Sequence, residues 1–156
     1  MINIPADDLK VINSILDNNI LMSVATFADY PWISSAYYVC DDELNFYFLS
    51  QPTTEHVAAI KKNANITWCV ANSLQRPEDE KTGFYASGTA TIINDLSKIK
   101  WMFTIYNRIF PSTKKKYTFK NFELKIITSN VVCATPKRIK VFAPHIFSDG
   151  GFKVWE

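Results

Sequence analysis

A group of polar side chains follows an alternating apolar run in the stretch LNFYFLSQPTTEHVAAIKKN, residues 44–63. Residues 44–49 alternate like a buried strand, and helical spacing begins near residue 57. Between them lie Ser50, Thr53, Thr54 and His56. The first turn of a helix leaves backbone N–H groups unpaired and carries positive dipole charge, so this group suits a phosphate monoester. An ordinary helix N-cap without a ligand is the alternative.

Residues 32–39, WISSAYYV, form a second pattern that bears on ligand binding. Alternation places Ser34 and Ala36 on one face of a predicted strand, and Ser35 and Tyr37 on the other. Small side chains at these positions leave the backbone open to close approach by a flat molecule, with bulky aromatic residues beside it. A strand with a mixed face and no ligand explains the same pattern.

Other kinds of active site find little support in the sequence. The two histidines, His56 and His145, lack the flanking residues of a metal site or a catalytic triad. No GxGxxG or phosphate-binding P-loop motif is present. We therefore assign no metal ligand and no catalytic residue, although Tyr37, Tyr38 and His56 are unranked candidates for proton transfer. Redox chemistry would have to come from a bound cofactor.

Composition predicts one domain over residues 1–156 and a cytoplasmic location. The 17 basic and 15 acidic residues give a formal charge of +2, and Lys114–Lys116 is expected to be a solvated loop. We therefore expect no nucleic acid as a partner. No apolar run approaches the roughly 20 residues that span a bilayer, and no signal peptide is evident, so we expect no membrane partner. Three scattered cysteines fit free thiols in a reducing compartment.

The periodicity of the chain predicts an α+β domain built on an antiparallel barrel of six or seven strands with a few flanking helices. The predicted helices start at Pro5, Thr54 and Asp95 or Ser97, and the last ends before Pro111. Strands are expected over residues 20–27, 32–40, 43–50, 65–72, 83–94, 122–128 and 137–143. Gly88 is expected at a bulge or a close approach, and residues 145–156 as a docking tail.

Two segments, LMSVATFADYPWISSAYYVCDDELNFYFLSQPTTEHVAAIKKNANITWCV and GFYASGTATII, together resemble the FMN-binding split-barrel superfamily, which includes pyridoxamine 5'-phosphate oxidase. The later IYNRIFPS and FKVWE look more like small uncharacterised bacterial members. The resemblance implies a split β-barrel, an FMN cofactor, and a homodimer with flavin in a groove between two barrels. It also implies positions for the cofactor: Ser34, Ser35, Ala36 and Tyr37 beside the isoalloxazine ring, and Ser50, Thr54 and His56 near the phosphate.

The chain departs from the family pattern at the phosphate. Where the oxidase has Arg and then Lys, this chain has Glu55 and His56. An anion thus replaces a bidentate phosphate donor, and a titratable group replaces a fixed cation. Hydroxyls, backbone amides and Lys61 or Lys62 would have to supply the remaining attraction. Modest FMN affinity and complete loss of the flavin both remain open.

These observations favour an FMN-binding, flavin-dependent oxidoreductase that acts on a small molecule, with NAD(P)H or a small organic reductant as electron donor. The alternative is a non-catalytic module that holds flavin, haem or another flat ligand on the same scaffold. The 11 Phe, 7 Tyr and 4 Trp exceed what a small barrel readily buries, which favours a homodimer interface. The regular apolar spacing in IYNRIFP favours packing of this segment over its closing across the groove. Arg108 is the residue in the segment that could reach an anionic ligand.

Overall fold

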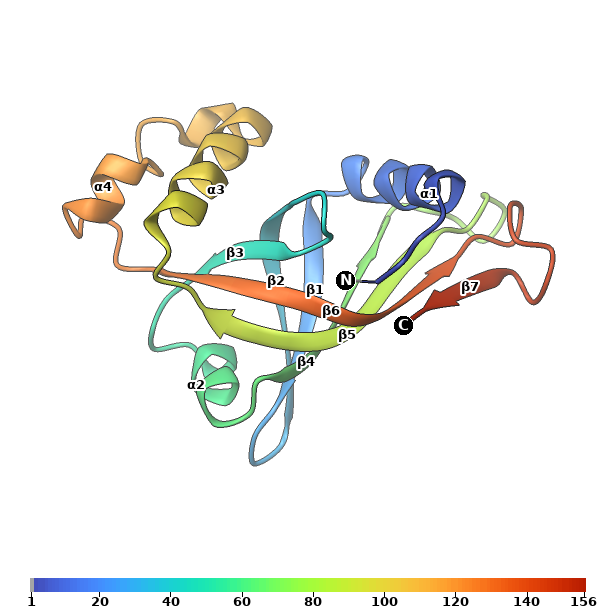
Figure 1. The fold of residues 1–156 in the computed structure, drawn as a ribbon, viewed down its shortest axis with the longest axis horizontal. Helices are drawn as coiled ribbons and strands as arrows, with labels where there is room; N and C mark the ends of the chain where they lie inside the picture. Colours follow the sequence, from blue (N-terminus) through green and yellow to red (C-terminus); the bar gives the residue numbers. More distant parts are fainter. Residues whose placement is uncertain (1) are drawn as a thin grey trace.

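A computed structural model describes residues 2–156 and shows six antiparallel strands closed into a barrel (Figure 1). The strands are β1 (Leu21–Phe27), β2 (Pro31–Cys40), β3 (Phe46–Ser50), β4 (Asn65–Ala71), β5 (Gly83–Ile92) and β6 (Asn130–Phe142). Their order is β3-β2-β1-β4-β5-β6, and pairing of β3 with β6 closes the ring. A seventh strand, β7 (Phe152–Trp155), pairs with β6 outside the ring. The predicted α+β barrel is confirmed.

The barrel interior is filled by side chains that alternate along each strand. Phe46, Phe48, Trp68 and Phe84 are fully or almost fully buried there, and Phe46 packs against three aromatic neighbours. Because aromatic side chains each bury a large apolar area, this cluster contributes strongly to the stability of the ring. A flat ligand therefore has no room inside the barrel.

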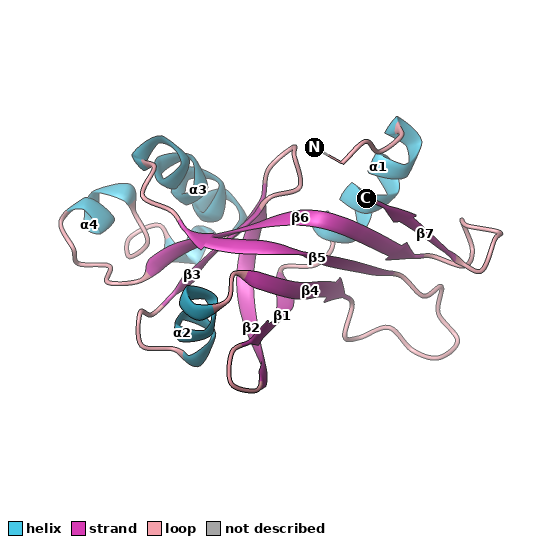
Figure 2. Cartoon of the chain, turned by 60° about the horizontal axis from the view of Figure 1, so that its bottom comes forward, coloured by secondary structure: helices cyan, strands magenta, loops and turns pink. Residues whose placement is uncertain are grey.

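Four α-helices lie outside the barrel, two of them together at one end of the molecule (Figure 2). They are α1 (Ala6–Asp17), α2 (Glu55–Lys62), α3 (Leu96–Ile109) and α4 (Phe119–Glu123), with a 3₁₀ turn, η1, over Pro111–Thr113. The carboxylate of Asp95 accepts hydrogen bonds from the backbone N–H groups of Ser97 and Lys98 and so caps α3. A second apolar cluster joins α3 to the outer side of β2, β3 and β6. None of the described helices is long and apolar enough to cross a membrane.

The strand predicted over residues 122–128 is wrong. These residues form the end of α4 and the turn after it. Thr118 caps α4 by accepting a 3.0 Å hydrogen bond from the backbone N–H of Asn121, and Lys125 turns the chain with φ +56°. The apolar run that follows, Asn130–Phe142, is instead one continuous strand that includes the segment predicted at 137–143. The sequence FELKII fits both the two-residue period of a strand and the 3.6-residue period of a helix. The N-cap at Thr118 favours the helix.

The C-terminal segment docks on the barrel as predicted. Strand β7 pairs with β6, and Trp155 is buried against Phe147. The Lys153 Nζ atom lies 2.9 Å from a carboxylate oxygen of Asp8, which is buried in α1. This ion pair ties the end of the chain to its first helix.

Gly88 occupies the expected bulge, where the β5–β6 register shifts between Ser87 and Gly88. A Cβ atom at Gly88 would lie 2.0 Å from the carbonyl oxygen of Thr135. Gly88→Ala should therefore lower the free energy of unfolding by roughly 2 kcal/mol or more, because backbone must move to relieve the overlap. Urea unfolding measures the loss, and the neighbouring Ser87→Ala should change stability by less than about 0.5 kcal/mol. Equal effects of the two substitutions would contradict the argument.

Candidate functional site

The barrel is split between β2 and β3. The ladder between them covers only residues 38–40 and 46–48. Beyond it, Leu49 and Ser50 pair with Val131 and Asn130 of β6, so β3 turns away from β2. Residues 31–37 of β2 consequently pair with β1 alone among the described strands. The split is therefore bounded by an unpaired strand edge on one side and by the end of β3 and α2 on the other.

The predicted ring-binding residues of β2 divide between two faces. Ser34 and Ala36 are half-buried on the side that faces the barrel interior, where they lie beside the split. Ser35 and Tyr37 are exposed on the outer side. The Tyr37 ring packs edge-on against Phe110, with 5.3 Å between ring centroids. Strand alternation thus brings two of the four residues to the split and directs the other two away from it.

Three of the four predicted phosphate-binding residues form one hydrogen-bonded cluster where β3 leads into α2. The Ser50 hydroxyl lies 3.0 Å from Thr54 Oγ1 and 2.5 Å from His56 Nε2. Thr54 Oγ1 lies 3.3 Å from the same histidine nitrogen. Thr53 is exposed, and its side chain makes no hydrogen bond within residues 2–156. We call Ser50, Thr54 and His56 the polar cluster.

The N-terminus of α2 has no side-chain cap. Thr54 stands at the N-cap position, but its hydroxyl donates to the Gln51 carbonyl at 2.9 Å. Within the described part of the chain, the backbone N–H groups of Glu55, His56 and Val57 have no acceptor. The ordinary N-cap considered above would have satisfied one of these donors. Three unsatisfied N–H groups therefore adjoin the polar cluster, which is the arrangement that binds an anion.

The electrostatics of the cluster are set by His56. Burial lowers the pKa of His56 below its ordinary value of 6.5, and the nearby charge of Glu55 only partly opposes this shift. The imidazole is therefore neutral near pH 7 and can accept a hydrogen bond from a hydroxyl. Glu55 is exposed and lines a separate hollow of about 130 Å³ with Tyr30 and Trp32. Its carboxylate does not enter the polar cluster.

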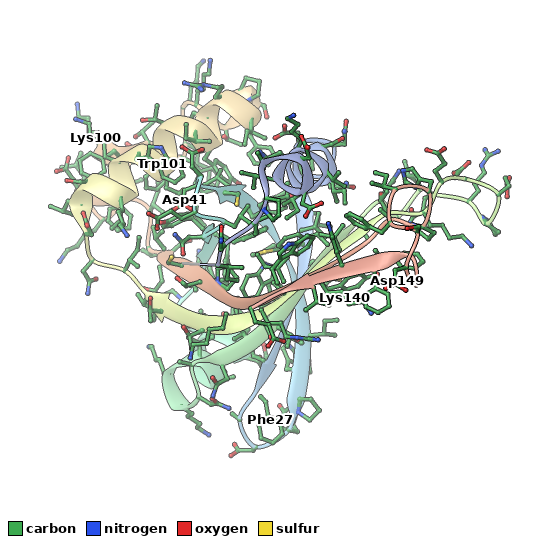
Figure 3. All side chains as sticks on the ribbon, turned by 45° about the vertical axis from the view of Figure 1, so that its right-hand side comes forward. Phe27, Asp41, Lys100, Trp101, Lys140 and Asp149 are labelled. Carbon is green, nitrogen blue, oxygen red and sulfur yellow. The ribbon has the colours of Figure 1, made fainter. Side chains whose placement is uncertain are left out.

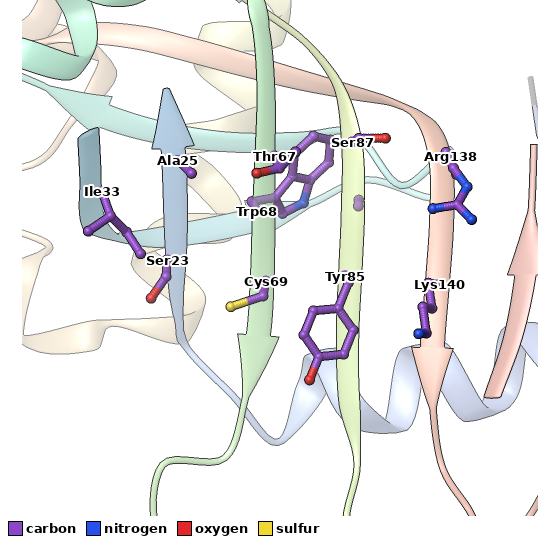
Figure 4. Close-up of a pocket in the computed structure, with 11 residues that line it drawn as sticks. Ser23, Ala25, Ile33, Thr67, Trp68, Cys69, Tyr85, Ser87, Arg138 and Lys140 are labelled. Carbon is purple, nitrogen blue, oxygen red and sulfur yellow. The ribbon is translucent and has the colours of Figure 1, made fainter. Parts of the chain in front are cut away.

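A second hollow, of about 320 Å³, lies on the outer face of β1, β4, β5 and β6 (Figure 4). Sequence reasoning missed its residues, which include Ser23, Ala25, Ile33, Cys69, Tyr85, Arg138 and Lys140. Arg138 Nε donates to Glu156 at 2.6 Å, and Lys140 Nζ lies 4.1 Å above the centroid of the Phe152 ring. We call this hollow the outer trough. The sequence signal that could have revealed it is the repetition of small residues at outward-facing positions of successive strands.

Among the remaining candidate residues, Tyr38 and the segment IYNRIFP take part in packing. Tyr38 donates to the carbonyl of Asn19 at 2.8 Å, and burial raises the pKa of its hydroxyl well above the ordinary value. Tyr106 is buried and Phe110 packs on it, as the spacing of IYNRIFP predicts, while Arg108 is exposed. No cluster of metal ligands occurs among the described residues, and their three cysteines are free thiols.

No protein-family model and no curated protein sequence matches the chain. Solved structures do match it. A protein related to general stress protein 26, of the pyridoxinephosphate oxidase family, from Clostridium acetobutylicum is 18% identical over 97% of this chain and 95% of its own, with a TM-score of 0.66. HutZ, the haem storage protein of Vibrio cholerae, is 12% identical over 86% of this chain and 92% of its own, with a TM-score of 0.69.

A third similar structure is that of Atu2129, a protein of unknown function from Agrobacterium tumefaciens. It is 14% identical over 90% of this chain, with a TM-score of 0.70, and this chain spans 60% of its length. Together the matches confirm the resemblance at the level of fold: the chain has the split barrel found in pyridoxamine 5'-phosphate oxidase-like proteins and in haem-binding relatives of that shape.

The lowered pKa of His56 predicts how stability depends on pH. The unfolded chain binds a proton at this residue more readily than the folded chain. The contribution of neutral His56 to the free energy of unfolding is therefore present above pH 6.5 and is lost as the pH falls below it. His56→Gln should therefore lose less unfolding free energy than the parent between about pH 7.5 and about pH 5.5. Urea titrations at both pH values measure the difference. Thr53→Val, which alters no titratable group, is the control and should behave like the parent; identical losses in all three proteins would refute the assignment.

Proposed function

We propose that the chain binds FMN in the split and acts as a flavin-dependent oxidoreductase on a small molecule. The observation that carries the proposal is the uncapped first turn of α2 beside the polar cluster. Both elements flank an unpaired edge of β2. A phosphate and a planar ring joined by a short chain would thus find their partners within one site.

The phosphate of FMN would accept hydrogen bonds from the backbone N–H groups of residues 55–57. The Thr54 hydroxyl would join them by turning its proton away from the Gln51 carbonyl, and the Ser50 hydroxyl by accepting from protonated His56 and donating to the phosphate. These donors need no rearrangement of the backbone, because Thr54 does not use its side chain as a cap. The positive end of the helix dipole adds attraction for a dianion. A bound dianion would also favour the protonated form of His56, so that the histidine becomes a cation when the site is filled.

The flavin ring would lie along residues 31–37 of β2. Its unpaired backbone edge offers donors and acceptors to the polar rim of the ring, while Ser34 and Ala36 are small enough to allow close approach. Bound FMN supplies hydride-transfer chemistry, with NAD(P)H or a small organic reductant as donor. The role of the chain is to anchor the phosphate, orient the ring and restrict water. The free cysteines fit a reducing, cytoplasmic setting.

A haem-binding or other non-catalytic module is the second candidate, and the likeness to HutZ favours it. The histidines argue for flavin instead. His56 Nε2 already contacts Ser50 and Thr54, and His145 lies 3.6 Å from Glu80, away from the split. A haem iron at the split would therefore compete with Ser50 and Thr54 for His56 Nε2.

A second copy of the chain would cover the site. Two exposed apolar side chains, Ile33 and Tyr85, line the outer trough. Three more are exposed on the same outer face of β1 and β2: Leu21, Phe27 and Tyr37. Exposed apolar groups around a hollow lined by small residues form a surface that a partner can bury. We propose that two barrels associate through this face as a homodimer, which would also shield the half-open split from water.

Removal of one cluster hydroxyl should weaken FMN binding selectively. Thr54→Val keeps the size of the side chain but loses the hydroxyl beside Ser50 and His56, so the FMN dissociation constant should rise about tenfold. Thr53→Val is the matched control, because Thr53 is exposed and hydrogen-bonds nothing among the described residues; its constant should stay within about twofold. Flavin fluorescence quenching measures both.

Two outcomes would overturn this proposal. The absence of saturable FMN binding by the parent would remove FMN as the cofactor, and equal effects of the two valine variants would remove the phosphate site. Oxidation of NADH or NADPH by the FMN-loaded parent would establish the enzyme. Tight binding with no turnover of either donor would favour the non-catalytic module.

A charge placed in the outer trough should separate the dimer. Ile33 is 68% exposed in the single chain, and Ile33→Lys would put an ammonium group into the apolar face. The variant should sediment as a monomer at concentrations where the parent is a dimer. Leu74→Lys, at an 84% exposed position outside the trough, should leave the dimer intact. A monomeric parent would contradict the proposed interface.

A further inference from the structure

Residues 95–126, between β5 and β6, form a basic lobe of α3, η1 and α4 at one end of the molecule (Figure 1). The lobe has eight basic and two acidic side chains, a formal charge of +6, which leaves −4 for the rest of the chain. The basic residues are Lys98, Lys100, Arg108, Lys114, Lys115, Lys116, Lys120 and Lys125. All eight are exposed, and within residues 2–156 none of them pairs with a carboxylate.

Asn121 holds the lysine loop against the turn that follows α4. Its side-chain amide donates to the carbonyls of Lys115 at 3.2 Å and Lys116 at 2.8 Å. The backbone carbonyl of Asn121 accepts hydrogen bonds from the backbone N–H groups of Ile126 at 2.9 Å and Ile127 at 3.1 Å. Residues 114–116, 120 and 124–126 therefore form one contiguous surface, which we call the lysine tip.

The lysine tip also exposes two aliphatic side chains. Leu124 is 60% exposed and Ile126 is 66% exposed, whereas Ile127 beside them is buried. Lys125 between them has a φ of +56°, a left-handed conformation that a residue with a Cβ adopts reluctantly. The turn is thus built so that Leu124 and Ile126 project outward next to lysines instead of joining the apolar cluster under α3.

We propose that the lysine tip binds the surface of an anionic lipid bilayer. Lysine ammonium groups would meet the lipid phosphates, and Leu124 and Ile126 would enter the boundary between headgroups and acyl chains. Nucleic acid is less well matched, because the tip presents exposed aliphatic side chains where single-strand binders present aromatic ones for base stacking. The proposal departs from the expectation that Lys114–Lys116 is only solvated and that no membrane is a partner, because the fold adds further lysines and two aliphatic groups to that run.

The charge distribution would orient the molecule on such a surface. Figure 3 shows Lys100 on α3 at one side of the molecule and Asp149, in the turn before β7, at the other. An anionic bilayer attracts the lobe and repels the rest of the chain, which carries net negative charge. The lysine tip would then face the bilayer.

Vesicle sedimentation tests the proposal with the full chain. The parent should bind vesicles of equal parts phosphatidylcholine and phosphatidylglycerol, and the bound fraction should fall as salt is added. The triple variant Lys114→Gln, Lys115→Gln, Lys116→Gln should bind at least tenfold more weakly, and so should Leu124→Gln with Ile126→Gln. Matched controls remove the same groups elsewhere. They are Lys10→Gln, Lys81→Gln, Lys137→Gln for charge, and Leu74→Gln with Ile146→Gln for exposed aliphatic groups.

Several results would overturn the proposal. One is that the parent fails to bind the anionic vesicles at low salt, and another is that it binds pure phosphatidylcholine equally well. A third is that the control variants lose as much vesicle binding as the tip variants. Unchanged binding of the Leu124, Ile126 variant would also overturn it, since insertion would then contribute nothing. Tighter binding of the parent to duplex DNA than to the vesicles would assign the tip to nucleic acid. Thermal melting of each variant ensures that folded proteins are compared.

Discussion

The central constraint in this structure is that β3 follows β6 along its whole length but stays beside β2 over only three residues. Its first residues pair with β2 and β6 together, but Leu49 and Ser50 pair only with β6. As β3 continues along β6 it diverges from β2, and the edge of β2 over residues 31–37 has no partner strand among the described residues. The same divergence places the start of α2 at the end of the opening. The candidate site is a consequence of barrel closure rather than a separate addition to it.

The filled interior determines what kind of ligand the barrel can hold. Phe46, Trp68 and Phe84 occupy the inside of the ring, so a planar molecule must lie at the split or on an outer face. At the split it would meet main-chain polar groups on one side and the α2 terminus on the other. Backbone donors impose few demands on side-chain identity. Such a site would therefore tolerate many substitutions around it.

Local patterns in the sequence predicted much of this arrangement. Alternation located the strands, Asp95 marked a helix start, and Gly88 marked the register shift, because each depends on neighbours along the chain. The sequence could not show that Thr54 donates to Gln51 instead of capping α2, since both hydrogen bonds suit the same residues. It also could not show that FELKII ends a helix, or that Cys69, Tyr85 and Arg138 gather on one face. Those outcomes depend on tertiary contacts between strands and on the turn that Asn121 organises.

The replacement of a fixed cation by His56 changes how an anion would be held. A lysine keeps its charge in the empty site and attracts an anion from a distance, but it must be desolvated when the site closes. His56 is instead neutral in its buried position and bonded to hydroxyls, so the empty site carries no unpaired buried charge. Charge would appear only when a dianion offsets the desolvation cost of the imidazolium. Such a site would stabilise the empty protein at the expense of affinity, and proton uptake would accompany binding. Specificity would then rest on the geometry of the N–H groups of α2, which do not titrate.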